Sequence, residues 1–91
     1  MDKILVVDDE PKITHVIAAY LRKEGFAVTE AFDGEEAFNL AQSKEFVLMV
    51  LDLMLPRISG EDVVKRLRRA GNNIPIILLT AKDTEEELIL G

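Results

Sequence analysis

The feature that most constrains the fold is an unbroken apolar run, VLMVL at residues 47–51, that ends at a single carboxylate, Asp52. A run of this length is typical of a strand buried on both faces of a parallel sheet. Asp52 would then stand at the carboxyl end of that strand, where open α/β sheets bind their ligands. An aspartate at a strand end can also simply cap a turn, so the rest of the chain has to decide between the two interpretations.

Apolar runs of this kind alternate with helical patterns along the chain. Four strands are predicted, at residues 3–7 (KILVV), 26–30 (FAVTE), 47–51 and 74–79 (IPIILL). Helix start signals lie between them: Pro11 suits a first helical turn, Asp33 with Glu36 forms a capping box, and Ser59 is a cap. Gly25 and Gly71 are expected to end the first and third helices.

Two further helical features complete the pattern. Thr84 predicts the start of one more helix near the end of the sequence. The first helix is expected to bury an apolar face formed by Ile13, Val16, Ile17 and Leu21.

The alternation of strands and amphipathic helices predicts one α/β domain over residues 1–91. Its sheet should be parallel, with helices on both faces and right-handed crossovers. No internal repeat or linker interrupts the sequence.

The composition excludes or disfavours several classes of function. The net charge is −6, which disfavours a nucleic-acid surface but is compatible with a cation site. Cysteine is absent, so disulfides and thiolate metal sites are excluded. No apolar run is long enough to cross a bilayer, so we expect a cytoplasmic protein without membrane contact.

Four polar residues, Asp8, Asp9, Asp52 and Thr80, come directly after predicted strands. If the first and third strands are neighbours, the three carboxylates meet in one crevice. Their mutual repulsion should raise at least one pKa unless a cation lies between them. Oxygen ligands without His or Cys favour Mg²⁺. The crevice therefore suits phosphoryl transfer to Asp52, with the Thr80 hydroxyl stabilising the transferred group.

Three motifs, ILVVDDE (4–10), LDLMLPRISG (51–60) and PIILLTA (75–81), carry a family resemblance. Together they resemble the receiver domain of two-component response regulators. The resemblance implies a flavodoxin-like, doubly wound parallel sheet of order 2-1-3-4, phosphorylation by a sensor histidine kinase, and Mg²⁺ as cofactor. It also implies a switch that controls an output rather than an enzyme with its own substrate. By analogy with similar receivers, that output is transcription regulation by an attached domain.

The resemblance also implies roles for individual residues. Asp52 matches the phosphoacceptor, and Asp9 and Asp8 match the direct and the water-mediated Mg²⁺ ligand. The backbone carbonyl of Met54 matches the third protein ligand. Thr80 matches the switch hydroxyl, and the backbone amide of Ala81 matches a group that contacts the phosphoryl group.

The sequence departs from the family pattern at its end. A fifth strand, which in the family ends in a lysine that pairs with the phosphoryl group, is absent, as is the fifth helix. Lys82 follows Thr80 too closely to replace that lysine. We therefore expect a receiver that is incomplete at its C-terminus, with impaired phosphorylation. The fourth strand would be an open edge, so we expect that the chain either self-associates through it or is a piece of a longer protein.

Two other functions stay open. One is a phosphohydrolase with an aspartyl nucleophile, although Met54 occupies the position where such enzymes carry a second Asp. The other is an interaction module that is never phosphorylated. His15 is expected to be a solvated surface residue, and the basic cluster of Lys65, Arg66, Arg68 and Arg69 is expected to complement a helix dipole.

Overall fold

The computed structural model of the chain describes residues 1–43 and 45–79. Its elements, in order, are β1 (Lys3–Val7), α1 (Pro11–Lys23), β2 (Ala27–Ala31), α2 (Gly34–Ala41), β3 (Phe46–Asp52), α3 (Gly60–Arg69) and β4 (Ile76–Leu79). The helix predicted to start at Thr84 lies outside the described residues. All seven described elements match an element that the sequence predicts.

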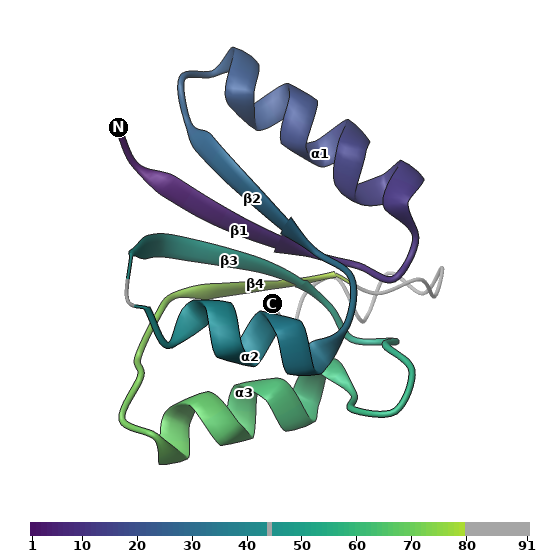
Figure 1. The fold of residues 1–91 in the computed structure, drawn as a ribbon, viewed down its shortest axis with the longest axis vertical. Helices are drawn as coiled ribbons and strands as arrows, with labels where there is room; N and C mark the ends of the chain where they lie inside the picture. Colours follow the sequence, from purple (N-terminus) through teal and green to yellow (C-terminus); the bar gives the residue numbers. More distant parts are fainter. Residues whose placement is uncertain (44, 80–91) are drawn as a thin grey trace.

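The strands form one parallel sheet in the order β2-β1-β3-β4. This confirms the predicted doubly wound arrangement, because the chain moves from β1 to one edge and then returns past β1 to the other. Figure 1 shows α1 on one face of the sheet and α2 and α3 on the other. The strand order therefore reverses between β1 and β3. In α/β sheets, ligands bind in the crevice at the carboxyl ends of the strands at such a point.

Successive side chains of a strand point to opposite faces of the sheet, so the core consists of two clusters, one on each face. Leu5, Val7, Met49 and Leu51 pack with residues of α2 and α3, whereas Ile4, Val6 and Val50 pack with Ile17 and Leu21 of α1. Full burial of an aliphatic side chain is worth about 1.5–3 kcal/mol. Both faces of β1 and the second half of β3 are thus buried, as the apolar runs predicted.

The helix caps are where the sequence places them. Asp33 Oδ1 accepts a hydrogen bond of 2.8 Å from the Glu36 backbone N–H at the start of α2. Ser59 Oγ accepts one of 3.1 Å from the Asp62 N–H at the start of α3. Each cap satisfies one of the backbone donors that a helix leaves unpaired in its first turn.

Other predictions need correction. In α1 the prediction is confirmed for Ile17 and Leu21, which pack against the core, and is wrong for Ile13 and Val16, which are exposed. The fully buried residues of the helix are Thr14 and Ala18. The reason is that Ile17 and Leu21 share a face with Thr14 and Ala18, while Val16 lies on the flank. β4 begins at Ile76, later than predicted, because the Ile74 N–H bonds to the Asn72 side chain.

Within the described residues, β4 pairs with β3 and with no second strand. Ile77, in the middle of β4, is 49% exposed. No helix in this part of the chain combines the length and the apolarity needed to span a membrane.

Candidate functional site

The end of each central strand places one carboxylate at the same edge of the sheet. Val6 of β1 is aligned with Val50 of β3, so the residues two positions later, Asp8 and Asp52, come out level. Because side chains alternate along a strand, both carboxylates continue the series that faces α1. The pairing of β1 with β3 in this register thus brings two acidic groups together.

Asp9 adds a third carboxylate. One carboxylate oxygen each from Asp8, Asp9 and Asp52 lies within 4.8 Å of the others. Asp8 and Asp52 are buried and Asp9 is exposed, so the group opens to solvent on one side. It lies in a hollow of about 350 Å³ that is lined by Asp8, Asp9, Glu10, Ile13, Asp52, Met54 and Leu79.

Backbone amides orient the two buried carboxylates. The Glu10 N–H donates to Asp8 Oδ1 at 2.9 Å, and the Met54 N–H donates to Asp52 Oδ1 at 3.1 Å. No described residue donates a hydrogen bond to the second oxygen of Asp52. That oxygen therefore stays available to a ligand or a reacting group.

Burial and the neighbouring carboxylates both affect the pKa of Asp8. Burial raises the pKa of Asp8, the Glu10 N–H opposes this, and the charges of Asp52 and Asp9 raise the pKa further. This is the direction that the sequence predicted for at least one member of the group. A divalent cation between the carboxylates would remove the repulsion.

Comparison with known proteins assigns the family. The response regulator receiver domain family matches residues 4–90. The chain belongs to this family.

A relative of this receiver domain is the alkaline phosphatase synthesis transcriptional regulatory protein PhoP of Bacillus subtilis. The two are 46% identical over 89 residues, which is 98% of the chain and 37% of PhoP. The chain thus spans little more than a third of the length of this relative.

Solved receiver structures have the same fold. The Francisella response regulator 1452 receiver domain superposes with a TM-score of 0.87 at 37% identity, over 99% of this chain and 74% of that one. The response regulator TrrA of Thermotoga maritima, solved in complex with Mg(2+)-BeF, gives 0.84 at 41% identity over 91% and 72%. TrrA has also been solved in complex with the histidine kinase ThkA, with a TM-score of 0.84 at 40% identity over 93% and 73%.

Gly60 is a residue that sequence reasoning undervalued. A Cβ at this position would lie 2.5 Å from the Asp52 carbonyl oxygen and 2.8 Å from the Leu53 Cα. These are backbone atoms, so a larger residue would displace the end of β3 that carries Asp52. The available signal was a glycine at the first position of the helix, directly after the Ser59 cap, although glycine is a poor helix former.

The other residues predicted for the receiver site divide into two groups. Met54 lines the hollow beside Asp52, and the role of its carbonyl stays a prediction. Thr80 and Ala81 lie outside the described residues, so their roles stay predictions as well. Leu79, the last described residue of β4, is aligned with Asp52 in the sheet.

Proposed function

We propose that this receiver domain accepts a phosphoryl group on Asp52 from a sensor histidine kinase and that Asp8, Asp9 and Asp52 bind Mg²⁺ for this reaction. The observation that supports it best is the approach of three carboxylate oxygens to within 4.8 Å. Such a set of hard oxygen donors, with one side open to water and phosphate, suits Mg²⁺, which keeps several waters and needs only one or two carboxylates. The Met54 carbonyl would be a further ligand.

In this proposal each residue has a distinct task. Asp52 is oriented by the Met54 N–H on Oδ1, and its second oxygen attacks the phosphorus atom. The new O–P bond forms as the P–N bond to the kinase histidine breaks, and the bonding pair returns to the imidazole. Bound Mg²⁺ supplies positive charge against the phosphoryl oxygens. Thr80 and the Ala81 amide are assigned to the same oxygens.

The partner and the output are part of the proposal. The TrrA–ThkA complex, formed by a protein 40% identical to this chain, supports a histidine kinase as partner. The relatives are named transcriptional regulators, which supports transcription control as the output, exerted by a region outside this chain. We infer a cytoplasmic location on the same basis. The receiver itself is assigned no contact with nucleic acid or membrane and no substrate turnover.

Intact-mass measurement after incubation with acetyl phosphate and Mg²⁺ tests this function. We expect a stable adduct of one phosphoryl group that disappears in Asp52→Asn and persists in Asp2→Asn, a matched change at an exposed aspartate. Phosphate release without an adduct would indicate a phosphohydrolase. No modification at saturating donor would indicate an interaction module, and either result would overturn the proposal.

A further inference from the structure

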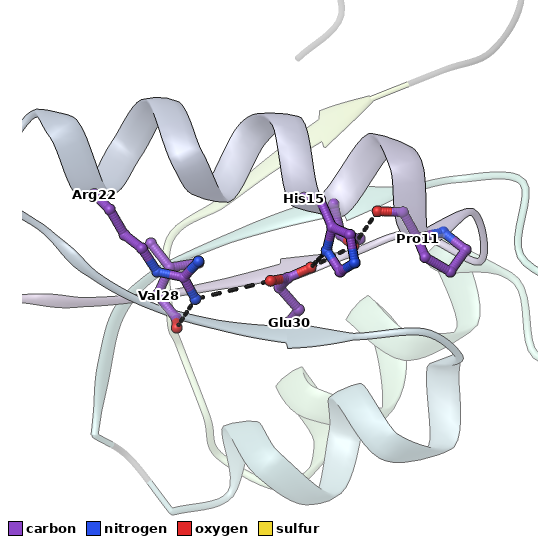
Figure 2. Close-up of polar contacts among 6 residues, drawn as sticks. Pro11, His15, Arg22, Val28 and Glu30 are labelled. Carbon is purple, nitrogen blue, oxygen red and sulfur yellow. Dashed lines mark hydrogen bonds and ion pairs between the residues drawn. The ribbon is translucent and has the colours of Figure 1, made fainter.

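A second polar cluster lies between α1 and β2, at a carboxylate that the phosphoryl-transfer proposal does not use (Figure 2). Three side chains of α1 surround Glu30 of β2. Thr14 Oγ1 donates to Glu30 Oε1 at 2.7 Å, and His15 Nδ1 lies 2.5 Å from the same oxygen. Arg22 Nη2 is 3.8 Å from Glu30 Oε2 and donates to the Val28 carbonyl at 3.0 Å.

The hydrogen bonds determine where the protons are. Thr14 has one hydroxyl hydrogen, and the 2.7 Å contact with a carboxylate outcompetes the 3.1 Å contact with the Pro11 carbonyl. Burial raises the pKa of Glu30, but the bonds from Thr14 and His15 and the charges of His15 and Arg22 outweigh it and lower that pKa. Glu30 is therefore ionised at neutral pH and has no hydrogen to donate. His15 Nδ1 must carry the hydrogen that joins the two residues.

The two residues differ in exposure in a way that suits a titrating contact. The His15 side chain is 64% exposed, so water reaches the imidazole, whereas the Glu30 side chain is 15% exposed. The charged groups that face Glu30 in the described part of the chain are His15 and Arg22, both on α1. Its neighbour on β1 is Val6, which is apolar. Arg22 keeps its charge at all relevant pH values, whereas histidine is the residue type that can change its charge near neutral pH.

We propose that His15 and Glu30 form a pH-dependent link that fastens α1 to the edge strand β2. When the imidazole is protonated, imidazolium pairs with the carboxylate, and when it is neutral, its Nδ1–H still donates to the carboxylate but the ion pair is lost. Because its pKa is lowered, Glu30 keeps its charge to a pH below its ordinary value of 4.5. The link is thus strongest at mildly acidic pH, where both side chains are charged. Neither residue is among those that line the acidic hollow.

Proton NMR of the imidazole gives the first test, because His15 is the single histidine of the chain. Glu30→Gln keeps the side-chain shape and removes the charge. We expect the midpoint of the imidazole titration to move to lower pH, because the carboxylate that favours the charged imidazolium is lost. Glu24→Gln is the matched control, since this exposed carboxylate pairs with no cation in the described part of the chain, and it should leave the midpoint unchanged. An unmoved midpoint in Glu30→Gln would overturn the proposal.

A double-mutant cycle in urea gives the second test and separates the link from a purely structural role. At about pH 5.5, the coupling between His15→Gln and Glu30→Gln should change the unfolding equilibrium constant two- to threefold, falling to about 1.5-fold or less at about pH 8. A coupling that is equal at both pH values, or absent at the lower one, would overturn the proposal. If Glu30→Gln does not fold, Glu30→Asp replaces it, since the shorter carboxylate should weaken the same coupling.

Discussion

At the residue scale, Asp8 carries much of the electrostatic cost of the acidic site. Its pKa is raised by burial and by the charges of Asp52 and Asp9, against the Glu10 N–H. A raised pKa means that the folded state favours the protonated form, so ionisation of Asp8 costs stability. This cost is absent at low pH, grows as the pH rises from the ordinary value of 3.8 through the raised one, and is complete at neutral pH.

We therefore expect Asp8→Asn to stabilise the metal-free chain at pH 7. The expected gain is about 1 kcal/mol, or about 4–8 °C in Tm for a domain of this size. Thermal unfolding followed by circular dichroism measures it. The gain should vanish below about pH 4, where Asp8 is protonated. Asp2→Asn, at an exposed position, should change the Tm little, and an equal gain there would show that net charge rather than the site is responsible.

At the element scale, β4 is one of the two edge strands of the described sheet. In the described residues it pairs with β3 alone, and its other edge presents backbone groups that favour pairing with a second strand. We infer that the 91-residue chain self-associates through this edge. Light scattering coupled to size exclusion should show a mass that increases with concentration.

Ile77→Lys tests whether β4 is the contact. Ile77 is 49% exposed, and an edge lysine opposes strand pairing, so this variant should be monomeric. Val47→Lys is the matched control, because Val47 is 46% exposed but belongs to β3. A monomeric parent chain, or loss of association in both variants, would contradict the inference.

At the scale of the whole molecule, Mg²⁺ should act as a stabilising ligand of the folded state. The three carboxylates come from two segments that only the fold brings together, so the unfolded chain offers no comparable site. At a Mg²⁺ concentration ten times the Kd, the expected stabilisation is about 1.4 kcal/mol. Urea unfolding with and without Mg²⁺ measures it, and EDTA should reverse it. Asp9→Asn should abolish the effect, whereas an unchanged effect would place the ion elsewhere.

Much of this architecture can be predicted because the signals are local. The apolar run before Asp52, the caps Asp33 and Ser59, and the alternation of strands and helices depend on neighbours in the sequence. Gly60 and Glu30 could not be assigned in this way. The reason for Gly60 is its contact with the Asp52 carbonyl, and the partners of Glu30 are three side chains of α1. His15 was expected to be merely solvated, and it is exposed as predicted, but it also pairs with Glu30.

The sequence by itself determined which segments are strands and helices, and that acidic residues follow two of the strands. Periodicity and capping are properties of short stretches, so they need no knowledge of the fold. Only the tertiary structure decided that β1 and β3 lie side by side in register, that α1 turns Thr14 rather than Val16 inward, and how closely the carboxylates approach. These outcomes depend on packing between segments far apart in the chain, where a displacement of one residue moves a side chain to the opposite face.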